Sequence, residues 1–394
     1  MSKICILGAG YGGLLTAVTL EKEGQPFTLI NKHDYHYFTT LLHEPAGGRN
    51  EFDSYYVDLH KVLRKDSSHI QKALVTELRP QDNKVVTDQG EVDYDYLVFA
   101  LGNAPEYFGI PGMQEHALVL RSLETAKELN DHIERVVASY KEDGDETKLR
   151  IVVGGAGLTG IELCGELAEW LPELAAEHGI PAEKMQLINL EAAPTILPML
   201  DEELREKAES VLRKKGVDLR TNTMITKVNE NQVELKTGDA IDAKTIIWTG
   251  GVRANPLIAD AGFEVDRKGR AKVNEYLQSV DYDNVFVIGD SAWFEDDEGK
   301  PLPPTAQAAS QMGEAAAENV LNLLHSRSLK KFEFNYMGTL ASLGSEIGVG
   351  EVKGLKTAGV SAGLMKEASK IKHLFNIGGF RMVALKRGQL KRKG

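Results

Sequence analysis

Cysteine is scarce in this sequence, with two residues among 394. Cys5 falls in the first apolar segment and Cys164 in a stretch with helical character, so they form neither a CxxC redox pair nor a metal clamp. The ten histidines are scattered without HExxH spacing, and we predict no metal site. Both cysteines are expected to be buried as small apolar side chains.

Long apolar runs are also absent. A membrane-spanning helix needs roughly 18 or more consecutive apolar residues, and no stretch of the chain meets that condition. Any contact with a membrane is therefore expected to be peripheral. The opening "MSKICILGAG" runs directly into an apolar strand without a cleavage-site pattern, so we expect the protein to stay in the cytoplasm.

Charge is unevenly distributed along the chain. The formal net charge is -12, but residues 366–394 carry nine Lys and Arg against one acid. The tail is therefore +8 and residues 1–365 are -20. Charge alone does not distinguish anionic lipid, nucleic acid or an acidic protein as the partner of such a tail.

A glycine-rich loop follows the first predicted strand. In "KICILGAGYGG", Gly8, Gly10 and Gly13 have GxGxxG spacing, and a helical stretch and the strand "FTLIN" come next. This order is typical of a β-α-β unit in which the glycines let a dinucleotide pyrophosphate approach a helix N-terminus.

A second copy of the unit lies in "LRIVVGGAGLTG", where Gly155, Gly157 and Gly160 repeat the spacing. The strand after it ends at Glu191, whose carboxylate would bind an adenosine ribose and repel a 2'-phosphate, which favours NADH over NADPH. The matching position in the first unit is the uncharged Asn31. Two loops indicate one permanent and one exchangeable dinucleotide.

Two later stretches suit the same architecture. One predicted strand ends near Ala100 and Gly102, and a proline-rich crossover at about residues 103–112 is a plausible domain junction. Another, "NVFVIGD", ends at Gly289 and Asp290. Gly289 would allow close approach of the backbone, and Asp290 would hold a polyol hydroxyl.

Together these features resemble the flavoproteins with two dinucleotide-binding domains. The run "PPTAQAASQMGEAAAENV" after "VIGDSA" is similar to the type II, non-proton-pumping NADH:quinone oxidoreductases. The resemblance implies an α/β fold with two Rossmann-like dinucleotide-binding domains, the NAD domain inserted in the FAD domain, and a C-terminal membrane-associating segment. It divides the chain into 1–112 (first part of the FAD domain), 113–245 (NADH domain), 246–328 (second part of the FAD domain, with a quinone-site helix) and 329–394 (membrane-docking region).

The resemblance also implies non-covalent FAD, with NADH as substrate. The FAD contacts carried over by position are Gly8, Ala9, Gly10, Tyr11, Gly12, Gly13, Asn31, Lys32, Val75, Ala100, Gly102, Asp290, Ala306 and Gln307. Those for NADH are Gly155, Gly157, Gly160 and Glu191. The implied function is a peripheral membrane enzyme that passes a hydride from NADH to FAD and two electrons on to menaquinone or ubiquinone, without proton pumping.

The helix predicted from Thr305 or Ala306 to about residue 324 begins after two prolines. If its N-terminus points at the flavin, as the resemblance implies, its partial positive charge stabilises the reduced flavin anion. Gln307 and Gln311 share one helix face. Spacing alone favours two solvent-facing amides, whereas the resemblance favours contact with a quinone carbonyl.

Two acids, Glu162 and Glu166, lie four residues apart after the second loop. An acid in a first helical turn suits the helix dipole and needs no further role. The resemblance favours a sharper interpretation, in which Glu162 faces the nicotinamide and flavin and, with a raised pKa, passes a proton to the quinone.

The C-terminal stretch "SAGLMKEASKIKHLFNIGG" predicts an interfacial amphipathic helix that ends at Gly378-Gly379. Its apolar face is Leu364, Ala368, Ile371 and Phe375, with Lys366, Lys370 and His373 elsewhere, and the final fifteen residues add Phe380, Met382, Val383, Leu385 and Leu390 among basic side chains. We expect it to dock on an anionic membrane at the cytoplasmic face. A packed helix with a solvated basic end, or the interface of an expected homodimer, would use the same face.

Other functions of this architecture fit less well. Disulfide reductases need CxxxxC beside the flavin, and sulfide:quinone oxidoreductases need redox cysteines there, which this chain lacks. A soluble NADH-dependent ferredoxin or rubredoxin reductase stays open but has no use for the tail. The function of a redox-sensing protein of the apoptosis-inducing-factor type also stays open. Nucleic-acid binding usually needs a broad basic face, whereas this chain has one short basic segment, so no nucleic-acid partner is predicted.

Overall fold

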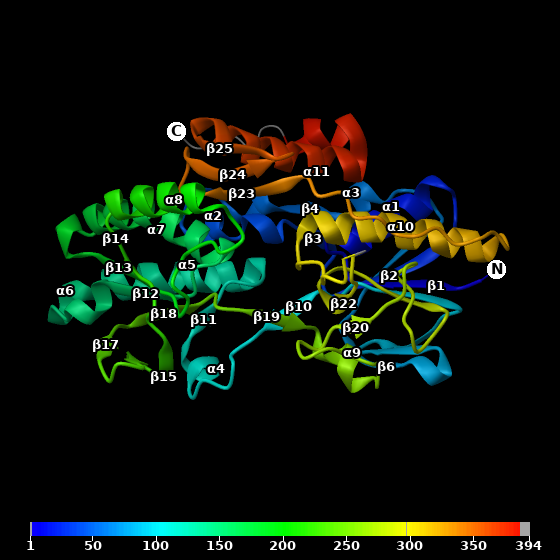
Figure 1. The fold of residues 1–394 in the computed structure, drawn as a ribbon, viewed down its shortest axis with the longest axis horizontal. Coiled ribbons are helices and arrows are strands. Elements are labelled where there is room, and N and C mark those ends of the chain that lie inside the picture. The colour runs from blue at the N-terminus through cyan, green and yellow to red at the C-terminus, as the bar shows by residue number, and fades with distance from the viewer. Residues whose placement is uncertain (1, 297, 387–394) are drawn as a thin grey trace.

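Two parallel five-stranded sheets form the body of the molecule (Figure 1). The computed structural model describes residues 2–296 and 298–386. The first sheet has the order β21 (Val285–Val287), β9 (Tyr96–Phe99), β1 (Ile4–Leu7), β2 (Phe27–Asn31) and β5 (Ser68–Lys72). The second has the order β11 (Leu118–Val119), β18 (Thr245–Trp248), β12 (Arg150–Gly154), β13 (Gln186–Leu190) and β14 (Val217–Arg220).

Each sheet is built around one apolar strand, because β1 is buried along its whole length and β12 along all but its first residue. Such strands suit a parallel sheet that is covered on both faces. The covering helices are α1 (Tyr11–Lys22) and α10 (Ala306–Leu324) in the first unit, and α5 (Leu123–Ala138), α7 (Leu158–Glu177) and α8 (Glu202–Lys214) in the second. This confirms the predicted α/β class with two Rossmann-like units.

Smaller elements complete each unit. Antiparallel sheets are formed by β6 (Val75–Arg79), β7 (Lys84–Thr87) and β8 (Gly90–Asp93), and by β15 (Ile225–Asn229), β16 (Gln232–Leu235) and β17 (Ala240–Asp242). Strands β3 (Tyr35–Tyr37) and β4 (Tyr56–Asp58) pair, as do β20 (Ala271–Lys272) and β22 (Ala292–Trp293). The short helices are α2 (His43–Ala46), α3 (Leu59–Val62), α4 (Met113–His116), α6 (Tyr140–Asp143) and α9 (Pro256–Asp260).

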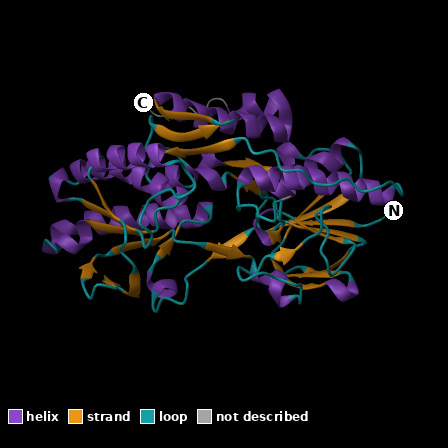
Figure 2. Cartoon of the chain, viewed as in Figure 1, coloured by secondary structure: helices purple, strands orange, loops and turns teal. Residues whose placement is uncertain are grey.

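The chain crosses between the sheets twice. Strands β10 (Asn103–Pro105) and β19 (Val252–Ala254) form an antiparallel pair that links the two units (Figure 2). Since β10 leaves the first sheet and β19 returns to it, the second unit is inserted into the first. The exact domain limits at residues 112 and 245 stay a prediction.

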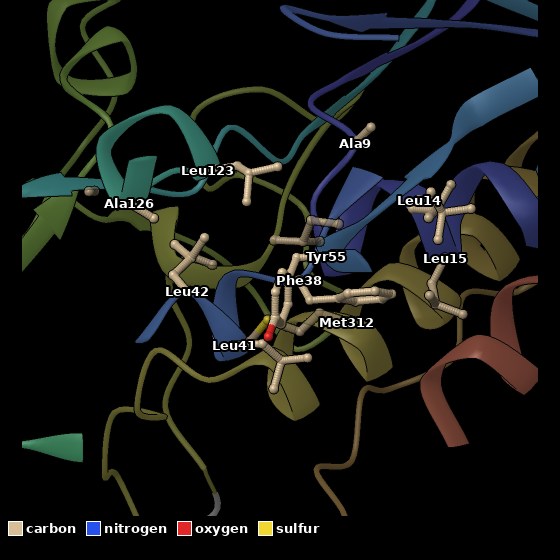
Figure 3. Packing of buried hydrophobic residues seen from close by; sticks show 14 of the residues in the cluster. Ala9, Leu14, Leu15, Phe38, Leu41, Leu42, Tyr55, Leu123, Ala126 and Met312 are labelled. Carbon is tan, nitrogen blue, oxygen red and sulfur yellow. The ribbon is translucent and has the colours of Figure 1, made fainter. Parts of the chain in front are cut away.

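Buried apolar side chains run from one unit into the other. Figure 3 shows Phe38, Leu41 and Leu42 packed between Leu14 of α1 and Leu123 of α5. Cys5 and Cys164 are both buried, as predicted for structural cysteines, and burial raises the pKa of each thiol to about 12.

The C-terminal region lies along both units, at the top of Figure 1. It contains the antiparallel sheet β23 (Gly338–Ser342), β24 (Gly348–Val352) and β25 (Leu355–Gly359), followed by α11 (Val360–Lys386). Helix α11 breaks at Gly378 and Gly379, where φ of Gly379 is +62°, as the sequence predicted. Within residues 2–296 and 298–386, no helix is long and apolar enough to cross a membrane.

The last turns of α11 differ from the predicted interfacial tail. Met382 is buried, Arg381 donates to the carbonyl of Lys61 (2.8 Å) and Lys386 donates to the carbonyl of Asp53 (3.0 Å). Met382 and Lys386 thus face the protein, which corrects their assignment to a lipid surface, whereas Phe380 and Leu385 are exposed. Leu390 and the basic residues from Arg387 onward lie outside the described residues.

Helices α1 and α10 approach each other through glycines. A Cβ on Gly313 would lie 2.2 Å from the carbonyl oxygen of Gly12, and the Thr16 hydroxyl donates to the carbonyl of Gly313 at 3.0 Å. The first turns of α1, which directly follow the first glycine loop, are therefore held against α10.

Replacing this glycine should destabilise the protein. Alanine is favoured over glycine inside a helix by about 1 kcal/mol, but Gly313→Ala forces the two backbones apart, and overpacking of this kind costs about 1–3 kcal/mol. We expect a lower thermal midpoint by circular dichroism. The exposed neighbour Glu314→Ala serves as the control and should leave the midpoint close to that of the wild type; an unchanged midpoint for Gly313→Ala would contradict the close packing.

Candidate dinucleotide and electron-transfer site

In each loop, the first and last glycines are required by the protein itself. Gly8 has φ +93° and Gly155 has φ +100°, in the left-handed region that favours glycine. A Cβ on Gly13 would lie 1.9 Å from the carbonyl oxygen of Gly8, and one on Gly160 would lie 2.1 Å from that of Gly155. Both loops therefore form the same tight strand-to-helix turn.

Glycine occurs at the middle position of each loop for a different reason. Gly10 and Gly157 precede α1 and α7 with ordinary extended backbone, and a Cβ on either meets no protein atom within 4 Å. Neither backbone strain nor internal packing requires glycine at these positions. The open space in front of a helix N-terminus fits a dinucleotide pyrophosphate, so the loops suit the predicted cofactors.

Asn31 and Glu191 occupy equivalent places at the ends of β2 and β13. The backbone N–H of Ala9 donates to Asn31 Oδ1 (2.9 Å), and that of Ala156 donates to Glu191 Oε2 (2.6 Å). The other Glu191 oxygen accepts from the Ala193 N–H at 2.8 Å. Both side chains thus brace their glycine loop, a role that an amide fills as well as an acid.

Asp290 lies in a one-turn helix after β21. Asn103 Nδ2 donates to Asp290 Oδ2 at 2.6 Å, and burial raises the pKa of the carboxyl although this hydrogen bond opposes it. The Ser291 hydroxyl nearby donates to the carbonyl of Gly102 at 2.6 Å. A carboxyl group in this position suits the predicted contact with a polyol hydroxyl, which stays a prediction.

The other predicted FAD contacts spread over the first unit. Tyr11 is the first residue of α1, and its hydroxyl lies 2.9 Å from Thr40 Oγ1. Val75 is buried at the start of β6. Ala100 follows β9, and its carbonyl oxygen would lie 2.6 Å from a Cβ on Gly8. Lys32 is exposed and pairs with Glu124 of the second unit at 2.8 Å.

The helix predicted from Thr305 or Ala306 begins at Ala306, with Thr305 as its N-cap. The side-chain amides of Gln307 and Gln311 both hydrogen-bond with the backbone of residues 335–338, where the irregular segment before β23 enters that strand. Gln307 donates to the carbonyl of Gly338 and accepts from the Met337 N–H, each at 3.0 Å, and Gln311 pairs in the same way with Asn335. Sequence alone did not reveal this positioning role, because the partners lie 24 to 31 residues away.

Glu162 on α7 is buried among polar groups from three other segments. Its Oε1 accepts from Lys366 Nζ (2.6 Å) and from the Ser342 N–H (3.0 Å), while Oε2 lies 3.4 Å from His43 Nδ1. Burial lowers the pKa of His43 well below its ordinary value, and the charges of Lys366, Arg49 and Lys370 add to this although Glu44 opposes it. The imidazole is therefore neutral, and sequence reasoning gave no signal for it.

Comparison with known proteins agrees with this geometry. Residues 2–313 match the family described as pyridine nucleotide-disulphide oxidoreductases. The type II NADH:quinone oxidoreductase of Staphylococcus aureus strain NCTC 8325 is 41% identical to this chain, with 98% of each chain covered. This chain belongs to the type II NADH:quinone oxidoreductase family.

Solved structures share the fold at lower identity. NDH2 from Plasmodium falciparum in complex with NADH aligns with a TM-score of 0.88 at 17% identity, covering 99% of this chain and 97% of that one. The sulfide:quinone oxidoreductase of Aquifex aeolicus aligns with a TM-score of 0.77 at 20% identity, covering 96% and 91%. Family membership makes this type II enzyme an FAD-dependent NADH oxidoreductase, which confirms both predicted cofactors.

Substitution should affect NADH binding at one glycine of the second loop and protein stability at another. Gly157→Ala adds a methyl group where only the ligand comes close, so we expect the KM for NADH to rise about tenfold, or roughly 1.4 kcal/mol, with unchanged thermal stability. Gly160→Ala is the contrasting control and should lower the thermal midpoint, because its Cβ clashes with the Gly155 carbonyl. Steady-state kinetics and thermal unfolding of both variants test this, and a normal KM for Gly157→Ala would contradict it.

Proposed function

We propose that this enzyme passes electrons from NADH through FAD to a membrane quinone, menaquinone or ubiquinone, without pumping protons, while docked on the cytoplasmic face of the cell membrane. The name of the S. aureus relative supports quinone as the acceptor. Bound FAD supplies the two-electron chemistry, and the chain positions NADH, holds the acceptor and handles protons.

Membrane docking is argued from the orientation of α11. The apolar residues Leu364, Met365, Ile371 and Phe375 are between 44% and 66% exposed. Lys366 and Lys370 of the same helix point inward to Glu162 and Glu44, whereas Lys372 is exposed near the apolar residues. A helix on a water-soluble surface exposes mainly polar side chains, so these exposed apolar residues are the observation that carries the proposal.

Neighbouring residues extend this apolar face. Leu355 in β25 is 74% exposed, Val360 at the start of α11 is 59% exposed and Phe380 after the glycine break is 83% exposed. Apolar side chains that enter the boundary of the lipid acyl chains support peripheral binding. A soluble ferredoxin or rubredoxin reductase would have no use for such a surface.

A homodimer is part of the proposal as well. The exposed apolar face of α11 can be covered either by the membrane or by a second subunit, but not by both at once. We assign it to the membrane because its apolar residues continue beyond the break at Gly378 and Gly379.

Protons for quinone reduction pass through Glu162 in this proposal. Its carboxylate is enclosed by Lys366, Ser342 and His43, and α11, which carries Lys366, is also the proposed docking helix. Through the 2.6 Å hydrogen bond the Glu162 carboxylate can take a proton from the Lys366 ammonium group and deliver it to a reduced acceptor. Gln307 and Gln311 remain candidates for quinone contact.

Removing the proton carrier should slow only the second half of the reaction. Glu162→Gln keeps the size of the side chain but carries no acidic proton, and general acid catalysis contributes about a hundredfold or more. We expect stopped-flow traces in which NADH reduces the flavin at the wild-type rate and menadione reoxidises it at least about a hundredfold more slowly. Wild-type reoxidation at every pH would contradict the role.

Vesicle binding should depend on the outward face of α11. The double variant Met365→Glu with Phe375→Glu is expected to lose at least about tenfold in affinity for anionic vesicles in sedimentation, since each buried apolar side chain contributes about 1.5–3 kcal/mol. Met224→Glu is the matched control, because Met224 is 43% exposed against 44% for Met365 but precedes β15 in the second unit. Equal vesicle binding by all three proteins would argue for the dimer interface or a solvated face.

A further inference from the structure

Four buried ionisable side chains connect α2, α7 and α11. Arg49 Nε donates to Glu166 Oε2 at 2.7 Å, and its Nη2 contacts the other oxygen of that carboxylate. Arg49 Nη1 lies 3.4 Å from Glu44 Oε1, and Lys370 Nζ donates to the same oxygen at 2.6 Å. The side chains of all four residues are at most 9% exposed.

Stability does not explain this cluster. Burial raises the pKa of Glu44, but the charges of Lys370 and Arg49 outweigh it and the pKa is lowered, so the acid is ionised. Buried ion pairs lose hydration and are often no more stable than apolar residues of similar volume. Arginine is suited to the centre of such a cluster because its planar fork holds two carboxylates in fixed directions.

The cluster lies one helical turn from the proposed proton carrier on both helices. Glu162 precedes Glu166 by four residues on α7, and Lys366 precedes Lys370 by four residues on α11. Arg49 and Glu44 therefore hold the two helices together beside the 2.6 Å contact between Lys366 and Glu162.

Glycine contacts fix α7 from two sides. A Cβ on Gly47, directly after α2, would lie 2.4 Å from Glu166 Cβ, and one on Gly165 would lie 2.4 Å from the backbone nitrogen of Gly344. The backbone beside Gly47 and Gly165 therefore lies directly against its neighbours, and the Arg49 fork adds two directed contacts at Glu166.

We propose that Arg49 is a positioning residue for quinone reduction: by holding Glu166 and Glu44 together it sets where Glu162 and Lys366 meet. This inference rests on the proposed proton role of Glu162. Arg49 touches neither of these two residues in the described contacts, so its effect on the reaction is indirect and specific to the half-reaction that uses Glu162.

Stopped-flow kinetics of the holoenzyme test this with menadione as acceptor. In Arg49→Gln, NADH should reduce the flavin as in the wild type, and reoxidation should be roughly ten- to a hundredfold slower. When Arg49→Gln is added to Glu162→Gln, reoxidation should slow no further, because both changes remove the same step. The control is Arg79→Gln on the surface, since Arg79 also bridges two acids, Glu77 and Glu91, each at 2.8 Å, and should change neither half-reaction.

Two results would overturn the inference: slowing in the double variant equal to the product of the single effects, or equal slowing of both half-reactions by Arg49→Gln. If Arg49→Gln does not retain FAD, Arg49→Lys undergoes the same comparison, since it keeps the charge but cannot hold both carboxylates. Fast reoxidation in Glu162→Gln alone would refute the proton route itself. Slow reoxidation in Glu162→Gln with wild-type kinetics in Arg49→Gln would refute only the positioning role.

Discussion

The ion pair between Lys366 of α11 and Glu162 of α7 joins the C-terminal helix to the catalytic body. Together with the pair of Lys370 and Glu44 it draws two lysines of α11 inward, because a buried acid without a cationic partner would be costly. Leu364, Met365, Ile371 and Phe375 face outward on the other side of the helix. One set of contacts therefore fixes both the surroundings of Glu162 and the surface that we assign to the membrane.

The dinucleotide loops could be predicted from the sequence because their chemistry is local. Gly8 and Gly155 need positive φ, and Gly13 and Gly160 must admit a backbone oxygen within the same turn. These requirements are met by residues at fixed spacing, so the motif and the fold follow from a short pattern. The roles of Asn31 and Glu191 as braces are less visible, since both span the loop to residues 22 and 35 positions away.

The candidate proton site was only half predictable. Glu162 stood out by its position after a glycine loop, but Arg49 contacts Glu166 across 117 positions and Lys366 contacts Glu162 across 204. No local pattern specifies such pairs. The sequence placed Lys366, Lys370 and His373 away from the apolar face of α11, without showing that the protein covers them. The buried Met382 likewise depended on the turn at Gly378 and Gly379.

The depth of α11 in a bilayer tests the central claim most directly. Since Cys5 and Cys164 are buried, Phe375→Cys provides a selective site for a bimane label, and Met224→Cys provides a control on the second unit. With anionic vesicles containing brominated lipids, fluorescence at position 375 should be quenched and that at position 224 should not. Absence of quenching at position 375 in vesicle-bound enzyme would contradict the account.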